Sequence, residues 1–198
     1  MNKERVLQAA LRSLGARDKD LSSEALLERV YDDNFDCFAP RALYGFFKIR
    51  RFAPEISVEG ADVTFSGESI RRHLQGAEGV VLNAFTLGAG TDKRIKELSF
   101  VRPSESIALN AIASVYAELI ADELLDRELE TYRAEGYRTS FRFCPGYGDL
   151  ALSTNESIQR ALDAAKKIGL SVTKDGFLLP RKSIIGIAGV YPKGREEV

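Results

Sequence analysis

The sequence has few of the side chains that most often carry enzyme chemistry. Its 198 residues include one histidine (His73), two cysteines (Cys37 and Cys144), one methionine and no tryptophan. One copy of the chain therefore cannot form a zinc site of four cysteines, of two cysteines and two histidines, or of three histidines. Radical iron–sulfur chemistry, which needs three closely spaced cysteines, is excluded too. A Ser-His-Asp or Cys-His mechanism would depend on His73 alone.

An excess of charge of one sign is also missing. Lysine and arginine number 28 against 29 aspartates and glutamates, so the net charge of −1 creates no general attraction to nucleic acid or to a membrane. Arg12 interrupts the apolar positions of the N-terminal segment, and no apolar run approaches the length of a membrane span. Two cysteines are too few for a disulfide framework, so we expect a cytoplasmic protein. These exclusions favour a small-molecule or protein-partner function.

What remains is typical of a globular protein, with 44% apolar and 29% charged residues. Helix and strand patterns mix without a regular βα repeat, which predicts an α+β fold. We find no internal repeat, low-complexity tract or Pro/Gly-rich linker. The sequence is therefore expected to form one unit over 1–198, with an N-terminal region of about 1–103 and a core of about 104–190.

Start and stop signals locate the expected helices. Ser66 is expected to cap a short helix that Gly76 ends, and Thr91 to cap one that runs through Leu98. Ser153 to Glu156 resembles a capping box. The expected helices cover residues 2–14, 22 to about 31, 66–76, 91–98, 104 to about 132, and 153–169.

Apolar runs and alternation predict the strands. Residues 137–143 alternate strictly, with Tyr137, Thr139, Phe141 and Phe143 expected on one face. The other expected strands are 43–52, 79–85 and 183–190, together with the hairpins 56–58/63–65 and 171–173/177–179.

Two partial motifs are weak. Gly88-Ala89-Gly90 follows an expected strand, but Lys93 occupies the place of the third glycine of a dinucleotide-binding pattern. This disfavours both nucleotide binding and an ordinary Rossmann methyltransferase, and we expect a simple turn. His73 and Gly76 match half of the Asp-x-His-x-x-Gly signature of corrinoid-binding domains, with Arg71 in place of the aspartate. A structural helix histidine is the favoured interpretation.

The longest expected helix carries a polar stripe at four-residue spacing: Asn110, Ser114, Glu118 and Asp122. Beside it run Ala113, Ala117 and Ala121, which permit another element to approach closely. A solvated helix face is the commoner explanation of such a stripe. The alternative is that Glu118 lies against a cleft and receives a cation or an amine.

The segment Arg142-Phe143-Cys144-Pro145-Gly146-Tyr147 is the strongest local signal. Arg142 offers a planar, permanently charged fork that suits a carboxylate. Pro145 and Gly146 predict a turn, and Tyr147 adds an aromatic ring with a hydroxyl. Cys144 is more often a small buried residue than a nucleophile. A structural turn and a carboxylate-binding site remain equally open on this chemistry alone.

The spacing Arg-x-x-x-Gly-Tyr resembles the S-adenosylmethionine-binding motif of the activation domain of cobalamin-dependent methionine synthase. The preceding helix with Glu118 and the segment from Leu179-Pro180 to Ser183 and Gly186 resemble that family as well, so the likeness covers about residues 104–190. The N-terminal part fits less closely, although residues 40–44 and 86–88 are similar to short members of the superfamily. The resemblance implies a central antiparallel sheet with flanking helices.

The resemblance implies the following site. Arg142 would hold the carboxylate of S-adenosylmethionine, Glu118 its polar groups, and the backbone at Cys144 and Gly146 would face the ligand beside Tyr147. A flavodoxin-type donor would reduce the cob(II)alamin of a partner protein by one electron, and the cob(I)alamin formed would take the methyl group. The chain would position the ligand and supply no acid, base or metal ligand, so it would act as a methyltransferase component only with a corrinoid partner.

The sequence departs from the family pattern in several places. Gly148-Asp149-Leu150 replaces a proline-rich continuation, and Ile187-Ala188 replace aromatics. The family's N-terminal ligand-binding aspartate has no match. The sequence ends at Val198, before the family's C-terminal segment with a ligand-contacting tyrosine, which leaves Tyr191 as the candidate substitute.

Two functions follow from the resemblance. The first is a standalone reactivation module that presents S-adenosylmethionine to a methionine synthase or a related corrinoid methyltransferase. The second is a non-catalytic module of the same fold that binds a corrinoid protein or senses S-adenosylmethionine. Because the corrinoid, homocysteine and folate modules are missing from the sequence, we do not expect it to synthesise methionine alone.

Overall fold

The computed structural model describes residues 2–15 and 21–193, and within them the chain forms an antiparallel six-stranded sheet, a two-stranded hairpin and the helices around them. The strand order of the sheet is β3-β2-β1-β4-β8-β5. Its strands are β1 (Arg41–Arg51), β2 (Ile56–Val58), β3 (Thr64–Phe65), β4 (Gly79–Thr86), β5 (Arg138–Thr139) and β8 (Ser183–Tyr191). The predicted α+β fold with a central antiparallel sheet is confirmed.

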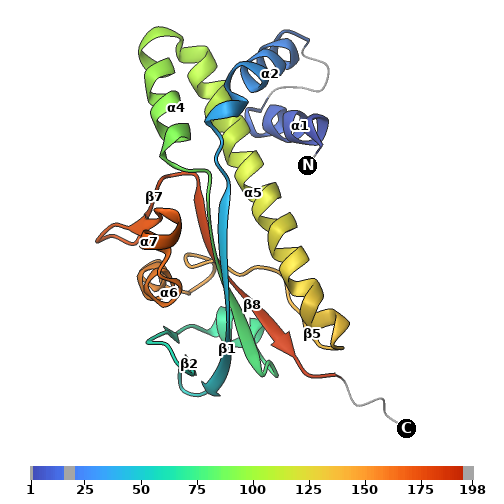
Figure 1. Ribbon diagram of the computed structural model, residues 1–198, viewed down its shortest axis with the longest axis vertical. Helices are drawn as coiled ribbons and strands as arrows, with labels where there is room; N and C mark the ends of the chain where they lie inside the picture. Colours follow the sequence, from blue (N-terminus) through green and yellow to red (C-terminus); the bar gives the residue numbers. More distant parts are fainter. Residues whose placement is uncertain (1, 16–20, 194–198) are drawn as a thin grey trace.

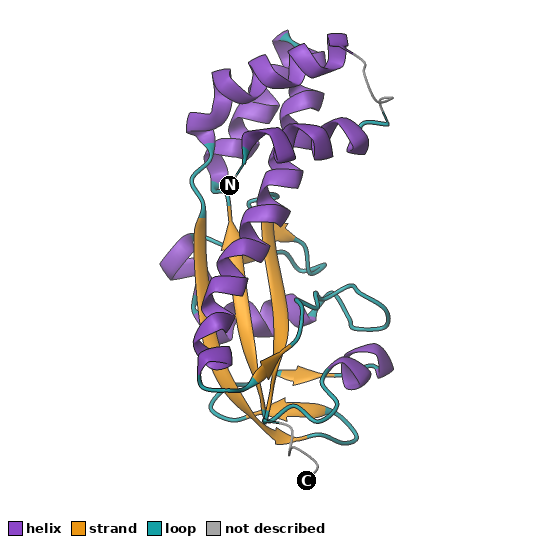
Figure 2. Ribbon diagram, turned by 90° about the vertical axis from the view of Figure 1, so that its right-hand side faces the viewer, coloured by secondary structure: helices purple, strands orange, loops and turns teal. Residues whose placement is uncertain are grey.

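The helices divide between one end of the molecule and the two faces of the sheet (Figures 1 and 2). Helices α1, α2 and α4 gather around the first half of α5 at one end, and the second half of α5 runs along the sheet. Helices α3, α6 and α7 pack on the opposite face. Their bounds are α1 (Lys3–Ser13), α2 (Leu21–Asn34), α3 (Glu68–His73), α4 (Ala89–Val101), α5 (Pro103–Ala134), α6 (Thr154–Leu162) and α7 (Ala164–Ile168).

The centre of the sheet is apolar because both of its faces are covered. All eight residues of β4 are buried, as are the seven residues between the ends of β8. In register, Asn83 of β4 lies opposite Gly186 of β8 and Tyr44 of β1. The predicted strand pattern is confirmed here and in both hairpins, the second of which joins β6 (Ser171–Val172) and β7 (Leu178–Leu179). A turn of 3-10 helix, η1 (Phe35–Cys37), leads into β1.

Three predicted caps are wrong. Helix α3 begins after Gly67, and Ser66 instead donates to Glu55. Helix α4 begins at Ala89 with Gly88 as its N-cap, so Thr91 lies inside the helix. Ser153 makes no side-chain cap bond, because its backbone is already helical (φ −59°, ψ −19°) rather than extended as a capping residue requires.

Two predicted elements are shorter than expected. Asp163 has φ 54°, a left-handed conformation that ends α6 and separates it from α7, so 153–169 is not one helix. Residues 137–143 pair with β8 at Arg138–Thr139, where Ser140 N–H also donates to the Gly189 carbonyl (3.0 Å), and again at the bridge of Phe143 to Ile187. Between these points the segment has one residue more than β8, so the register shifts, Phe141 is exposed and the predicted strict alternation fails.

Candidate functional site

The segment that carries Arg142 is held against β8 by backbone pairing. Phe143 and Ile187 exchange two N–H···O bonds of 2.8 Å. Phe143 packs with the cluster on the α3 and α6 side of the sheet, and the Arg142 side chain lies on the α5 side. The bridge at Phe143 thus anchors the backbone beside Arg142 and directs the arginine between the sheet and α5.

The Arg142 stem rests on a glycine of β8, and the helix that pairs with its guanidinium carries buried alanines. An ideal Cβ atom on Gly186 would lie 2.4 Å from Cγ of Arg142, so the arginine stem rests directly on the glycine backbone. On the other side, Ala113, Ala117 and Ala121 of α5 are all buried. These alanines let α5 run close to the sheet, as their pattern in the sequence predicts.

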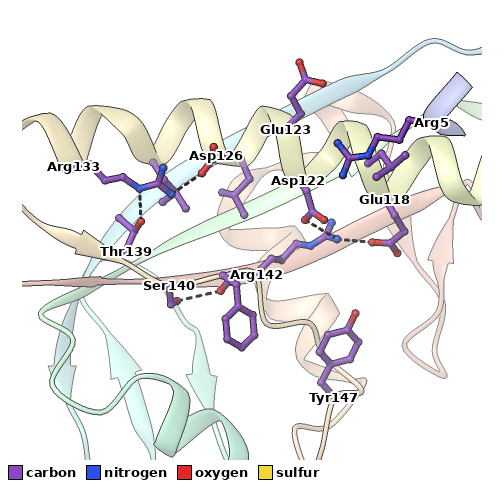
Figure 3. A pocket seen from close by; sticks show the side chains of 14 residues that line it. Arg5, Glu118, Asp122, Glu123, Asp126, Arg133, Thr139, Ser140, Arg142 and Tyr147 are labelled. Atoms are coloured by element: carbon purple, nitrogen blue, oxygen red, sulfur yellow. Dashed lines mark hydrogen bonds and ion pairs between the residues drawn. The ribbon is translucent and has the colours of Figure 1, made fainter. Parts of the chain in front are cut away.

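The Arg142 guanidinium is paired with two carboxylates of α5. Its Nη2 atom donates to Glu118 and lies 3.0 Å from Asp122, as Figure 3 shows. The arginine side chain is 6% exposed, whereas both carboxylates are more than half exposed. Its Nη1 atom is buried and has no partner among the described residues. The site therefore has a buried guanidinium whose Nη2 atom is paired with carboxylates and whose two Nη1 N–H groups have no acceptor among the described residues.

The rest of the polar stripe on α5 is also occupied by a cation of this chain. Lys182, in the segment before β8, donates to Asn110 (2.7 Å) and to Ser114 (2.8 Å). Burial lowers the pKa of Lys182. The polar stripe of α5 therefore binds the side chains of Lys182 and Arg142 and is not only a solvent-exposed helix face.

The turn after Arg142 brings Cys144 and Tyr147 together. Tyr147 N–H donates to the Cys144 carbonyl (3.0 Å), and Gly146, at φ 94°, adopts a conformation that favours glycine. Burial raises the pKa of the Cys144 thiol. The neighbouring Cys144 and then burial raise the pKa of Tyr147, whose half-exposed ring meets Phe143 edge-on at 5.7 Å. The Cys144 carbonyl accepts the hydrogen bond of the turn and its side chain packs against the apolar cluster around α5, so the observed contacts of Cys144 are structural.

Two grooves flank this turn. The first, of about 830 Å³, runs between α5 and residues 139–142 and includes Asp122, Arg142 and Arg133 in its lining. The second, of about 640 Å³, lies between the turn, α6 and the start of β8, and includes Cys144 and Ile185. Glu118 and Tyr147 line both grooves. The predicted residues Arg142, Cys144, Gly146, Tyr147 and Glu118 are therefore brought together.

Tyr191 lies away from this cluster. It is on the opposite face of β8 from Arg142, where its hydroxyl donates to the carbonyl of His73. His73 itself shares a 2.9 Å hydrogen bond between Nε2 and the Ser140 hydroxyl, and burial lowers the pKa of its imidazole. The histidine thus links α3 to the segment that carries Arg142, in agreement with its interpretation as a structural residue.

The expected turn at Gly88-Ala89-Gly90 begins α4, and Gly90 lies close to the carbonyl of Cys37. Motif analysis did not single out Lys182, which bonds to the polar stripe of α5, or Asn83, which lies near the Arg142 stem over Gly186. An asparagine within the otherwise apolar run 79–85 was the available signal for Asn83. Among residues 2–15 and 21–193, no three His, Cys, Asp or Glu residues are grouped as a metal site would require. In the same residues, no helix has the length and apolarity to cross a bilayer.

Comparisons with known proteins support the fold. The sequence matches no family model and no curated protein. Its structure is similar to a crystal structure of the MetH reactivation domain bound to AdoHcy, with a TM-score of 0.69 and 17% sequence identity over 94% of this chain and 71% of that chain. The expected resemblance to the methionine synthase activation domain is therefore confirmed at the level of the fold.

Proposed function

We propose that the chain is an activation-type module that binds S-adenosylmethionine and presents it to a corrinoid-carrying methyltransferase. The observation that carries this proposal is the buried Arg142 guanidinium, placed beside Glu118 and Tyr147 where two grooves meet. The fold is shared with a domain whose crystal structure is described as bound to AdoHcy, the demethylated form of S-adenosylmethionine.

The residues at the site suit the ligand's charged groups. The amino-acid end of S-adenosylmethionine has a carboxylate, which a guanidinium binds in a fork. The same end has an ammonium group, and Glu118 and Asp122 provide half-exposed carboxylates next to the guanidinium. Tyr147 offers an exposed ring to the rest of the ligand, and the backbone at Cys144 and Gly146 lies beside it. Arg142 would thus anchor the ligand and the carboxylates would orient it.

The chain's own contribution is to bind and orient. S-adenosylmethionine, when bound, supplies an activated methyl group on a sulfonium, so transfer to a cobalt atom needs no acid or base from the protein. The cobalamin would belong to a partner such as methionine synthase, with a flavodoxin-type electron donor, in the cytoplasm. Four exposed apolar side chains lie on or beside the grooves and suit contact with such a partner: Phe141, Tyr147, Phe177 and Leu179.

A methyl-transfer assay tests the proposal. The chain, S-adenosylmethionine and reduced flavodoxin are added to an oxidised methionine synthase fragment that lacks its activation domain, and methylcobalamin is followed by its absorbance. We expect methylcobalamin to form with the wild type and to form at least about tenfold more slowly with Arg142→Ala, since a charge-assisted pair is lost. Arg133→Ala, in the same groove, is the matched control and should leave the rate unchanged.

The same fragment, reactivated by its native activation domain, serves as the positive control. If that control forms methylcobalamin and this chain does not, the reactivation role is wrong. Binding of S-adenosylmethionine without methyl transfer would instead support the non-catalytic sensing module. Removal of the Arg142 side chain leaves Glu118 and Asp122 without their cation, which could destabilise the fold. Circular dichroism of Arg142→Ala therefore checks that the variant folds.

A further inference from the structure

Asn83 is a polar residue in the middle of a fully buried strand. It is 3% exposed, and its Nδ2 atom has no acceptor among the described residues. A buried amide without a partner destabilises a fold, and an apolar side chain of similar size would avoid that cost. The presence of asparagine at this position therefore needs an explanation.

The position of Asn83 relates it to Arg142. Asn83 lies opposite Gly186 in the sheet, and an ideal Cβ on that glycine would be 3.1 Å from Asn83 Nδ2 and 2.4 Å from Arg142 Cγ. The amide is thus beside the arginine side chain, whose Nη1 atom is also buried without a partner. The two unpartnered donors thus belong to side chains that meet over Gly186 on the α5 face of the sheet.

The surroundings of this pair are otherwise apolar. On β4, the neighbours of Asn83 on the same face are Phe85, in the cluster at the helical end, and Val81, in the cluster under the second half of α5. The polar side chains of Asn83 and Arg142 lie where these two clusters meet. They form a thin polar layer in which two donors, Asn83 Nδ2 and Arg142 Nη1, have no acceptor among the described residues.

We propose that Asn83 is a positioning residue for Arg142, and that Nδ2 and Nη1 together hold one oxygen acceptor. The acceptor is either a buried water molecule or a carboxylate oxygen of the bound ligand. The ligand oxygen as acceptor rests on the proposed function, whereas the water molecule does not. In both cases the acceptor fixes the orientation of the guanidinium by occupying the edge that Glu118 and Asp122 leave free.

Crystal structures of the free chain and of the chain with S-adenosylhomocysteine test the acceptor directly. We expect one oxygen atom within about 3.2 Å of both Asn83 Nδ2 and Arg142 Nη1. An oxygen in the free structure identifies water, and one that appears only in the complex identifies the ligand. The inference is wrong if neither structure has such an atom, or if the free structure lacks it and the ligand does not bind.

An Asn83→Val variant separates positioning from packing. Valine suits a buried strand and fills a similar volume, so we expect the variant to fold with only a small change in melting temperature. The affinity for S-adenosylmethionine should nevertheless fall about tenfold, because the Arg142 guanidinium is less well held. A purely structural Asn83 predicts unchanged affinity, whatever the change in melting temperature, and that result would overturn the inference.

Ser57→Val is the matched control. Ser57 on β2 is also buried with an unpartnered hydroxyl, but β1 separates its strand from β4 and β8, where Asn83 and Gly186 lie. Its replacement should leave the affinity unchanged. If wild-type protein binds no S-adenosylmethionine in calorimetry, the proposed function fails, and the free crystal structure alone then decides the inference.

Discussion

Arg142 has a well-defined position because each of its parts meets a different kind of neighbour. Its aliphatic stem lies on Gly186, its Nη2 atom meets Glu118 and Asp122, and α5 passes close to it on alanines. The charged end is removed from water while its partners remain more than half exposed. A ligand carboxylate can therefore compete with two solvated carboxylates for a cation that is already oriented.

Gly186→Ala tests this arrangement at the level of one methyl group. The new Cβ would lie 2.4 Å from Arg142 Cγ and 2.7 Å from Cδ, so the arginine stem must leave the sheet. We expect unfolding to become easier by about 1–3 kcal/mol, as for other overpacked positions. We also expect an affinity for S-adenosylmethionine at least about tenfold weaker, measured by calorimetry.

Gly189→Ala controls for overpacking as such. On the same strand but the opposite face, its Cβ would meet the Tyr191 ring at 2.8 Å and so should also reduce stability. Its affinity should stay near that of the wild type. Equal losses of affinity in the two variants would contradict the specific role given to Gly186.

At the scale of elements, the loop after Tyr147 is attached to α3 by Asp149. The two carboxylate oxygens of Asp149 accept the backbone N–H groups of Glu68 (2.6 Å) and Ser69 (2.9 Å), the first two of the helix. These bonds lower the pKa of Asp149 to about 2. Asp149 thus caps a helix that lies 80 residues earlier in the chain and holds the turn with Tyr147 in place.

This cap predicts a pH dependence of stability. Because the folded-state pKa lies below the ordinary value, ionised Asp149 stabilises the fold above about pH 4, and the contribution is lost as the pH falls toward 2. Asp149→Asn should lower the melting temperature near pH 7, and the difference from the wild type should narrow in acid. Asp175→Asn, at an exposed turn, should shift the melting temperature little. A difference that does not change with pH would contradict the assignment.

Asp149 also illustrates what the sequence can and cannot predict. Ser66, next to the start of α3, was the natural candidate for its cap, but the cap comes from a residue brought near only by the fold. Local signals located β1, β4, β8 and both hairpins, because apolar runs and turn-forming residues within a few positions of each other are enough to predict such elements. The failure at 153–169 is of another kind, because Asp163 interrupts the helix with a left-handed backbone (φ 54°) that the periodic apolar pattern does not indicate.

The candidate site was predicted to a similar extent. The spacing from Arg142 to Tyr147 and the stripe through Glu118 were visible in the sequence, and the structure brings them together. Asp122 appeared only as one more polar residue of the stripe. The contact of Arg142 with Gly186 and the place of Asn83 near it were not predictable, because they depend on strand register and on how closely α5 approaches the sheet.

At the scale of the whole molecule, α5 connects the helical end to the sheet (Figure 1), and the site lies where it passes from one to the other. The first half of α5 packs with α1, α2 and α4, and its second half covers β4 and β8. The polar layer of Arg142 and Asn83 separates these two apolar regions. This arrangement, with exposed apolar groups such as Phe141 and Phe177 nearby, fits a module that orients a small ligand for a partner.

Calorimetric titration of the chain with S-adenosylmethionine tests the central claim most directly. We predict saturable binding at one site per chain, weakened about 10- to 100-fold by Arg142→Lys, which keeps the charge but loses the planar fork. Arg133→Lys, at the other end of the same groove and paired with Asp126 at 2.7 Å, should bind like the wild type. The account is contradicted if the wild type gives no binding heat, or if Arg142→Lys binds as tightly as the wild type.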